Sequence, residues 1–462
     1  MRFAVFTHVI HQQQADRFYA YSPYVREMNL WFKYVEEVEV VAPASQPPKG
    51  EFSAKDSYQH AHINFTKVPS FALLDFTSSV KAAFRMPIII FKIAGAMKRA
   101  DHLHLRCPGN IGLLAAITQI FFPKKLKTVK YAGNWDPEAK QPWTYKLQKK
   151  ILSNTFLSRN INVLVYGDWP NQSGNILPFF TASFSEEEKE LILKDFKPPY
   201  KFIFTGNLVK GKGLFEAIDL IKALNNNGLN SELEIYGDGI LKDSLNDYIQ
   251  RNGLQEFVKL KGRKSLEELK EVYKKAHFIV LLSKSEGWPK AVAEAMFFGC
   301  IPIATGVSCV PWMLGGGSRG ILISDGNEVD EKLVESGHPP LRFGQGGQRS
   351  EENQDGLGKV DGGLLDTFQK NRQFECLPVS PEGERRNVSR TGFSETLEVT
   401  SGINNEWKDA LKATVQKIIE LINDPEEMKR MSREAQEWSQ EYTLEKFEEA
   451  IKKLLVPQDA RP

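Results

Sequence analysis

The apolar residues of this chain recur as short continuous runs that alternate with longer stretches apolar on one side only. Runs at residues 2–9 and 38–42 have the pattern of buried strands, and a helical stretch at 23–36 lies between them. A strand, a helix and a second strand form the opening unit of a parallel α/β sheet. The order continues with strands at 102–105, 128–132 and 162–166 and helices at 112–121 and 143–153. We therefore predict one doubly wound domain over residues 1–183.

A second series of the same kind starts near residue 201. Before it, the charged segment at 185–200 ends in two prolines, which predicts a helix followed by a linker between domains, the linker spanning 184–200. The series itself comprises strands near 201–205, 233–236, 258–260 and 277–282 and helices near 213–225, 240–252 and 265–275. We predict a second α/β domain over residues 201–440.

Two later segments depart from this alternation. Residues 328–404 are rich in Gly, Ser, Glu and Arg and have little apolar periodicity, so we predict a mostly disordered or loosely structured insertion there. Residues 441–462 form the last predicted unit, and their helix at 443–455 is a candidate to cross back to the first domain.

The length and composition agree with two domains and restrict the classes of partner that the protein is expected to bind. The chain has 462 residues, a length that exceeds the usual size of a single core. Of these residues 41% are hydrophobic and 26% charged, as is ordinary for globular proteins. Its 60 basic and 58 acidic residues nearly cancel, so nothing in the total charge favours a nucleic-acid partner. Four cysteines without metal-ligand spacing fit a reducing cytoplasm. No apolar run reaches the ~20 residues of a membrane span, so any membrane contact is expected to be peripheral, at the inner face.

The stretch SEGWPKAVAEAMFFGC carries the most distinctive chemistry. Pro289 suits the first position of a helix and Gly299 suits its end, which puts Glu286 in the preceding turn and Glu294 in the second turn. The free N–H groups around 288–291 form an anion site at the positive helix end. An anion beside two carboxylates that can accept from hydroxyl groups fits a nucleotide sugar. The alternative is a solvated loop glutamate and a glutamate on the helix surface.

With FTGNLVKGKGLFEAI, IYGDG, VKLKGR and ILISDG around it, this stretch resembles the family-4 retaining glycosyltransferases of the GT-B fold, over roughly residues 200–326. The resemblance implies two facing Rossmann-like domains, the acceptor in the first and a nucleotide-diphosphate sugar donor in the second. It implies transfer of a hexose, with retention of anomeric configuration, to a saccharide or lipid-linked saccharide in cell-surface polysaccharide or glycoconjugate synthesis. Neither a metal nor a cofactor is expected.

The same resemblance assigns the donor residues. It implies that Glu286 lies near the sugar hydroxyls, that Glu294 binds the ribose, and that Lys212 meets the diphosphate, where an ammonium also stabilises the departing charge. Gly206 allows the backbone to approach the ligand at the end of a strand. The other expected donor contacts are Asn207, Lys261, Gly262, Arg263, Gly287, Trp288, Pro289 and Lys290.

One departure from the family pattern lies in the donor site. The family commonly has an arginine where this chain has Asn207, so one cationic partner of the diphosphate is missing. We take Lys210 or Arg263 as the hypothetical substitute.

The first domain departs from the pattern at its first strand. Residues 7–14 replace the usual Gly-Gly loop, so His8 and His11 are acceptor-side candidates, with a structural role as the alternative for each. Arg106 is a further candidate for a phosphate or acceptor contact, with a buried ion pair as the alternative.

The loop at 133–137 lies where the family often has a histidine and an aspartate near the donor sugar. Asn134 and Asp136 are the polar candidates for catalysis there, together with Lys212 and Glu286, and Trp135 is a candidate for stacking on a sugar face.

Other functions stay open. A nucleotide-sugar epimerase or a phosphorylase would use the same fold, and a catalytically weak nucleotide-sugar-binding protein is the alternative from another class.

Overall fold

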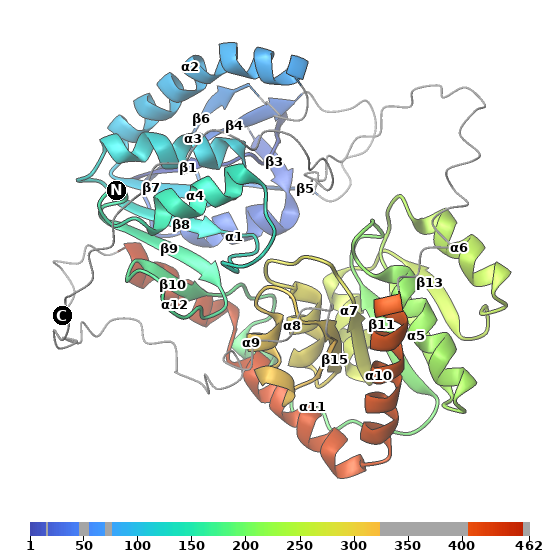
Figure 1. The fold of residues 1–462 in the computed structure, drawn as a ribbon. Coiled ribbons are helices and arrows are strands. Elements are labelled where there is room, and N and C mark those ends of the chain that lie inside the picture. Colours follow the sequence, from blue (N-terminus) through green and yellow to red (C-terminus); the bar gives the residue numbers. More distant parts are fainter. Residues whose placement is uncertain (15–16, 46–54, 70–75, 324–404, 456–462) are drawn as a thin grey trace, which may run out of the picture. The chain divides into compact units, whose positions relative to one another are not determined.

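The structure is a computed structural model that describes residues 1–14, 17–45, 55–69, 76–323 and 405–455, all of which belong to one compact unit (Figure 1). The predicted insertion at 328–404 lies outside the described residues. Cys376 lies there too, whereas Cys107, Cys300 and Cys309 are buried free thiols.

The N-terminal lobe is built on a parallel sheet whose first strand lies in its middle. The strand order is β10-β9-β8-β7-β1-β4, and β6 pairs with β4 on the side away from β1. The strands are β1 (Arg2–Phe6), β4 (Glu37–Ser45), β6 (Ile63–Val68), β7 (His102–Cys107), β8 (Leu126–Tyr131), β9 (Ile161–Tyr166) and β10 (Ile176–Phe179). Three short strands, β2 (His11–Gln14), β3 (Arg17–Tyr21) and β5 (Lys55–Ser57), extend the sheet beyond the end of β4.

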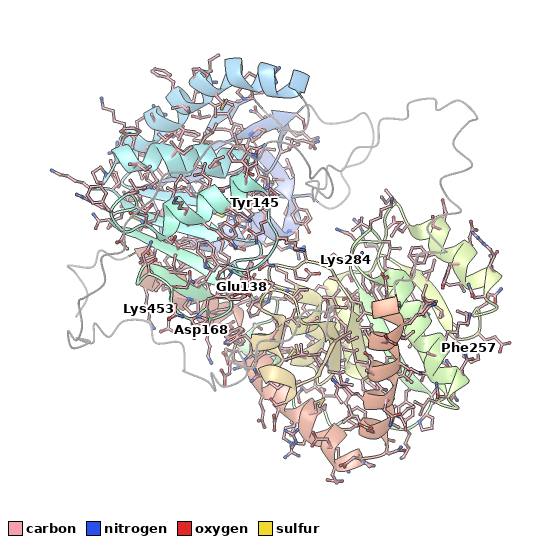
Figure 2. All side chains as sticks on the ribbon, viewed as in Figure 1. Glu138, Tyr145, Asp168, Phe257, Lys284 and Lys453 are labelled. Carbon is pink, nitrogen blue, oxygen red and sulfur yellow. The ribbon has the colours of Figure 1, made fainter. Side chains whose placement is uncertain are left out.

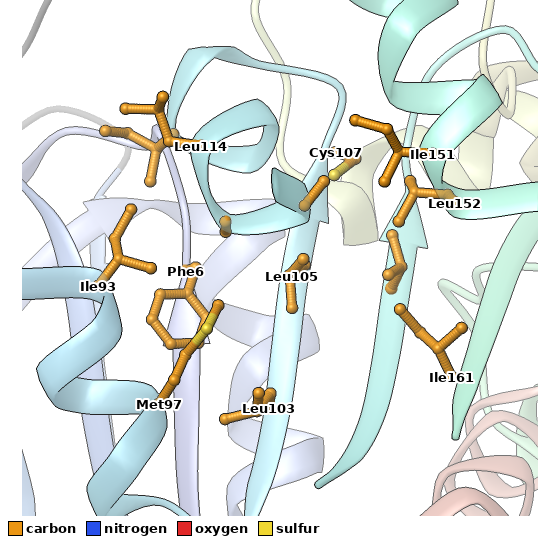
Figure 3. Packing of buried hydrophobic residues seen from close by; sticks show 14 of the residues in the cluster. Phe6, Ile93, Met97, Leu103, Leu105, Cys107, Leu114, Ile151, Leu152 and Ile161 are labelled. Atoms are coloured by element: carbon orange, nitrogen blue, oxygen red, sulfur yellow. The ribbon is translucent and has the colours of Figure 1, made fainter. Parts of the chain in front are cut away.

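All six residues of β7 are buried, and their side chains point alternately to the two faces of this sheet. Leu103 and Leu105 join the core under α2 (Phe76–Arg99), α3 (Asn110–Thr118) and α4 (Trp143–Ser153), which Figure 3 shows from close by. The rings of His102 and His104 stack on Phe3 instead, on the face that α1 (Ser22–Phe32) covers with Trp31. Burial of side chains on both faces is what a strand between two helical layers requires.

The C-terminal lobe repeats the plan. Its parallel sheet has the order β13-β12-β11-β14-β15-β16. The strands are β11 (Tyr200–Thr205), β12 (Ser231–Tyr236), β13 (Val258–Gly262), β14 (Phe278–Leu281), β15 (Ile301–Thr305) and β16 (Ile321–Ile323). The helices between them are α5 (Leu214–Asn226), α6 (Lys242–Arg251), α7 (Leu266–Lys275), α8 (Lys290–Phe297) and α9 (Val310–Met313). Two parallel α/β sheets confirm the predicted fold class.

The described residues 405–455 form three helices: α10 (Asn405–Ile422), α11 (Pro425–Gln440) and α12 (Leu444–Leu455). Helix α11 packs on α8 of the C-terminal lobe. Helix α12 contacts the N-terminal lobe, where the ring of Phe447 lies 5.4 Å from that of Phe179 and Glu448 pairs with Lys33 at 3.1 Å. The last helix therefore crosses back to the first lobe.

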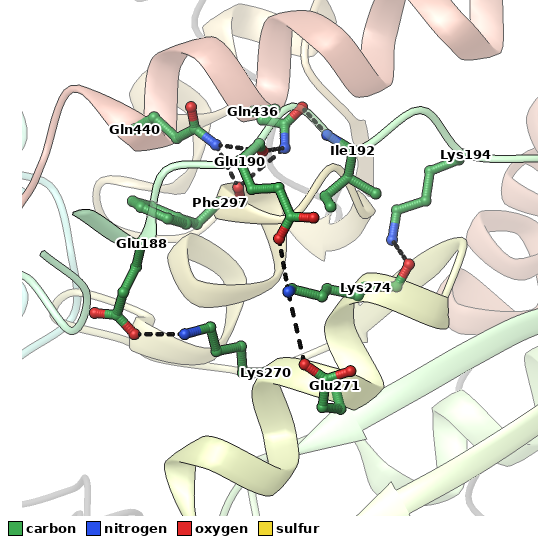
Figure 4. A network of polar contacts seen from close by, with 10 residues as sticks. All are labelled: Glu188, Glu190, Ile192, Lys194, Lys270, Glu271, Lys274, Phe297, Gln436 and Gln440. Carbon is green, nitrogen blue, oxygen red and sulfur yellow. Dashed lines mark hydrogen bonds and ion pairs between the residues drawn. The ribbon is translucent and has the colours of Figure 1, made fainter. Parts of the chain in front are cut away.

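The predicted helix at 185–200 is wrong. Only a single 3₁₀ turn forms, η2 (Glu186–Glu188), and the chain continues without helical structure to β11. Distant partners hold this segment, as Figure 4 shows: Lys270 pairs with Glu188 at 2.8 Å and Lys274 with Glu190 at 2.6 Å. Gln436 of α11 donates to the Glu190 carbonyl at 2.8 Å. Because these contacts use the backbone and both charges, tertiary structure overrides the helical tendency of the sequence.

Candidate functional site

The site residues of the C-terminal lobe gather at the carboxyl ends of two neighbouring strands. β11 lies between β12 and β14, so the chain leaves it in one direction and later returns on the other side. Ligands of open α/β sheets bind at such a switch point. The loop at 206–213 follows β11, and the loop at 282–289 follows β14; Lys284 of the second loop is labelled in Figure 2.

These two loops contact each other through a glycine. Gly213 has a φ of 68°, and a Cβ atom built on it would lie 2.2 Å from the carbonyl oxygen of Leu282. Lys284 also donates its backbone N–H to the Gly211 carbonyl at 2.9 Å. Any side chain at position 213 would push the loops apart, so glycine fixes how the preceding lysine is presented.

Lys212 and Glu286 are thereby brought together. Lys212 Nζ lies 2.6 Å from Glu286 Oε1, and the glutamate side chain is only 10% exposed. A charge-assisted hydrogen bond of this length fixes the direction of both side chains. Two residues that were predicted to bind different parts of a donor, the diphosphate and the sugar, are thus in direct contact with each other.

Glu294 is held from inside the protein. Helix α8 begins at Lys290, with Pro289 just before it as its N-cap, and Glu294 lies in its second turn. Its carboxylate accepts hydrogen bonds from Ser183 at 2.6 Å and from the hydroxyl group of Tyr273 at 3.1 Å. Burial raises the pKa of Glu294 above its usual range. A glutamate solvated on the helix surface is therefore not what the structure shows.

The turn between the two glutamates is packed rather than open. Trp288 is buried, and its ring lies 5.7 Å from that of Tyr166 and 6.1 Å from that of Trp438. Pro289 is also buried, whereas Lys290 is half-buried at the start of α8. The Gly287 carbonyl accepts from the thiol of Cys309 at 3.0 Å. Of these four predicted donor contacts, Lys290 has the most accessible polar side chain.

The remaining donor candidates line the neighbouring strand ends. Gly206 donates its N–H to the Tyr236 carbonyl at 3.0 Å, and the Gly262 carbonyl accepts from Gly237 at 2.9 Å, so the ends of β11, β12 and β13 are joined. Lys261 pairs with Glu234 at 3.1 Å. The exposed residues of these loops include Asn207, Lys210 and Arg263.

The N-terminal lobe has its own switch point, where β1 lies between β4 and β7. His8 follows β1 and is exposed, and a Cβ atom on Gly109 would lie 2.5 Å from its Nδ1 atom. His11 is buried, bonded through Nε2 to the hydroxyl group of Tyr58 at 2.7 Å and through Nδ1 to the Val9 carbonyl at 2.8 Å. Burial lowers the pKa of His11 to about 4. The structure therefore gives His11 the structural role and leaves His8 accessible.

Arg106 takes part in a buried ion pair. Its guanidinium donates to Glu27 of α1 and lies 5.3 Å from the centre of the Tyr24 ring. The structure thus gives Arg106 the alternative role, that of a structural ion pair. Its guanidinium is not a free cation at the surface that could bind a phosphate.

The loop after β8 is organised by its own polar side chains. Asn134 Oδ1 accepts from the backbone N–H of Asp136 at 2.8 Å, and Asp136 Oδ1 accepts from that of Glu138 at 2.9 Å. Trp135 is 2% exposed, and its ring centre lies 4.8 Å from that of Tyr131. The predicted stacking of Trp135 on a sugar thus finds no exposed ring face, because the indole belongs to the core.

Two side chains of the site were missed from the sequence. Ser183 and Tyr273 hold Glu294 although they lie 111 and 21 residues away from it, at no recognisable spacing.

Within the described ranges, no three His, Cys, Asp or Glu side chains are placed to hold a metal ion together. A search of the same residues finds no helix with the length and apolar character that crossing a membrane demands.

Two Rossmann-like lobes, each with a parallel sheet between helices, form a GT-B fold. Residues 185–335 match the family described as Glycosyl transferases group 1. The whole architecture is similar to that of a sucrose-phosphate synthase from Thermosynechococcus elongatus, with a TM-score of 0.54, 12% identity and 98% of each chain covered.

Curated relatives match the same region in part. An uncharacterized glycosyltransferase of Methanocaldococcus jannaschii is 32% identical over 139 residues, which is 29% of this chain and 38% of the relative. A GDP-mannose:cellobiosyl-diphosphopolyprenol alpha-mannosyltransferase of Xanthomonas oryzae pv. oryzae is 29% identical over 129 residues, 28% of this chain and 34% of the relative. The chain thus matches little more than a third of the length of either relative.

Proposed function

We propose that this protein is a retaining glycosyltransferase that transfers a hexose from a nucleotide-diphosphate sugar to a hydroxyl group of a saccharide. The observation that carries the proposal is the contact of Lys212 with Glu286 at the switch point of the C-terminal sheet. A cation and a hydrogen-bond acceptor side by side suit a ligand in which a sugar is joined to a diphosphate. The match of residues 185–335 to the glycosyltransferase family supports the same reaction class.

In this proposal the donor is held without a metal. Lys212 meets the diphosphate, whose other oxygens accept from the first N–H groups of α8. Glu286 accepts from hydroxyl groups of the hexose. Glu294 accepts from the ribose, for which it exchanges its bond to Ser183 or Tyr273.

The reaction breaks the bond between the anomeric carbon and the diphosphate oxygen and forms a bond to the acceptor oxygen. The acceptor proton passes to the departing phosphate oxygen, so no further co-reactant is needed. Lys212 stabilises the charge that develops on this leaving group. The exposed His8 is the residue that we assign to the acceptor side, and the half-buried Asn134 and Asp136 are the polar residues that we assign to catalysis near the donor sugar.

The acceptor class follows by analogy. One relative is named as a mannosyltransferase that acts on cellobiosyl-diphosphopolyprenol, so we include lipid-linked saccharides with free saccharides as acceptors for this chain. We place the reaction in the cytoplasm, which the three buried free thiols support.

Two measurements test the proposal. A panel of nucleotide sugars is screened for its effect on the melting temperature, since a ligand that binds the folded state raises it. The stabilising donors, labelled in the sugar, are then incubated with saccharide and lipid-linked acceptors. We expect a labelled product that keeps the anomeric configuration of the donor. Tight binding without turnover for any acceptor would support a nucleotide-sugar-binding protein instead.

A further inference from the structure

Charge is unevenly distributed along this chain. Residues 85–159 contain 14 Lys and Arg but only 3 Asp and Glu, a net charge of +11, whereas the whole chain carries +2. Three of these cations, Arg106, Lys127 and Lys130, are buried. Most of the others lie on α2 and α4 and on the segments that follow α3 and α4, so this layer of the N-terminal lobe is strongly basic.

The outer side of α2 combines this charge with apolar side chains. Ile89 and Ile93 face the core, whereas Phe91 is 79% exposed and Ile88 54% exposed. Lys98 is exposed seven residues after Phe91, so both lie on the outward side of the helix. Helices α2, α3 and α4 lie side by side over one face of the sheet in Figure 1.

The loops after α3 and α4 continue this surface. Phe121 is 78% exposed and Phe156 is 72% exposed. Lys125 donates to the Lys98 carbonyl at 3.3 Å, and Asn160 donates to the Pro123 carbonyl at 3.0 Å, so the ends of the three helices are adjacent. The basic-apolar face is defined by six residues: Phe91, Lys98, Phe121, Lys124, Phe156 and Arg159.

We infer that the basic-apolar face binds the surface of an anionic lipid bilayer. Each Lys or Arg near such a surface strengthens binding by about fivefold, and exposed Phe side chains beside cations enter the boundary between headgroups and acyl chains. A nucleic acid would also attract the cations, but Ile88 and Phe91 on a regular helix offer it no hydrogen bonds. The inference goes beyond the proposed transfer reaction and does not rest on it.

Vesicle sedimentation with the full chain tests this. We expect binding to vesicles of phosphatidylcholine with phosphatidylglycerol, weaker binding to phosphatidylcholine alone, and a steep loss as salt is raised. The double variant Lys98→Gln/Lys124→Gln should lower the partition coefficient roughly 25-fold, at about fivefold per cation. Phe121→Ser/Phe156→Ser should weaken binding even at low salt, because the rings contribute without charge.

Matched controls come from the C-terminal lobe. Lys242→Gln/Lys259→Gln removes two exposed cations and Ile240→Ser removes an apolar side chain that is 78% exposed; none should change vesicle binding. Melting curves verify that every variant is folded. The inference is overturned if anionic vesicles do not bind, if both lysine pairs have equal effects, or if short RNA binds through the same residues while vesicles do not. Transfer to a soluble acceptor should be unchanged in the face variants, so this test and that of the proposed function fail separately.

Discussion

Lys212 Nζ lies 2.6 Å from Glu286 Oε1, a contact that joins the loop after β11 to the loop after β14 across 74 residues of sequence. A donor that uses both side chains has to replace or share this ion pair. The pair therefore orients the two residues in advance, and the free energy of breaking it is offset by the new contacts with the diphosphate and the sugar.

Replacement of Lys212 by alanine should abolish most of the transfer activity. The ammonium is the cation that we assign to the leaving diphosphate, and loss of one such electrostatic contact lowers kcat roughly 100- to 1,000-fold. Initial rates with labelled donor measure the effect. Lys242→Ala, which removes an exposed lysine of α6, is the control and should be unchanged. A Lys212→Ala rate within about twofold of wild type would remove this residue from the mechanism.

Replacement of Gly213 by alanine should be far more damaging than the same change at Gly228. Both glycines have positive φ, 68° and 83°, but only the first would place its Cβ atom against a carbonyl oxygen, 2.2 Å away. We expect Gly228→Ala to cost about 1–2 kcal/mol from backbone strain, and Gly213→Ala about 3 kcal/mol or more because the loops must also separate.

Urea unfolding measures both glycine variants, and nucleotide binding is followed alongside. Binding should weaken only in Gly213→Ala, because Lys212 moves with its neighbour. Equal losses of stability in the two variants would show that the contact between the two loops adds nothing to the free energy of unfolding.

Much of the alternating fold could be predicted because each central strand is a continuous apolar run between turn residues. The strand at 201–205 and the helix at 143–153 are found within one residue of the expected limits, as β11 and α4. The GWP turn and the glycine-rich loops could likewise be assigned to a candidate donor site, since each motif consists of residues close together in sequence.

What could not be predicted depends on partners far away in the chain. β2 has the sequence HQQQ, which has no apolar alternation and forms a strand because β3 and the end of β4 flank it. The segment at 185–200 is not helical because it forms ion pairs with α7 and a backbone hydrogen bond with α11 instead. The bond between Ser183 and Glu294 could not be predicted for the same reason, since only the folded chain brings residue 183 to α8.

Glu294 should give the protein a stability that depends on pH. Because burial raises its pKa, the folded state holds the proton more tightly than the unfolded state, whose pKa is about 4.3. This contribution to the free energy of unfolding is present below the unfolded pKa and is lost as pH rises through the higher folded value. Glu294→Gln does not titrate, so its stability relative to wild type should increase over that range. Urea unfolding at a series of pH values measures the difference, and parallel curves would contradict it.

Glu294→Ala separates the structural role of this residue from its binding role. Both Ser183 and Tyr273 lose their acceptor, which should cost about 1–3 kcal/mol of stability at all pH values. The glutamine variant keeps one acceptor and should be nearly as stable as wild type near neutral pH. If Glu294 accepts from the ribose, both variants lose affinity for nucleoside diphosphates in calorimetric titrations; unchanged affinity in Glu294→Gln would exclude that role.

Lys130 should make the protein more stable as pH rises above neutrality. Its ammonium is fully buried, donates to the Phe180 carbonyl at 2.7 Å, and lies 4.2 Å from the ring centre of Phe179 and 5.4 Å from that of Phe447 on α12. Burial lowers the pKa of Lys130 to about 7, from about 10.4 in an unfolded chain. The unfolded state therefore binds more protons between these values, and stability increases with pH there.

The variant Lys130→Met tests this linkage, because methionine fills a similar volume and cannot titrate. Relative to this variant, the wild type should gain up to about 1.4 kcal/mol for each pH unit above 7. The exposed Lys150, changed to methionine, is the control and should follow the wild-type curve. If the difference between wild type and Lys130→Met is constant from pH 7 to about pH 9, the lysine keeps an ordinary pKa in the folded state. In that case the aromatic rings around it, including Phe447 of the crossing helix, stabilise a charged ammonium and α12 is docked partly by cation-π attraction.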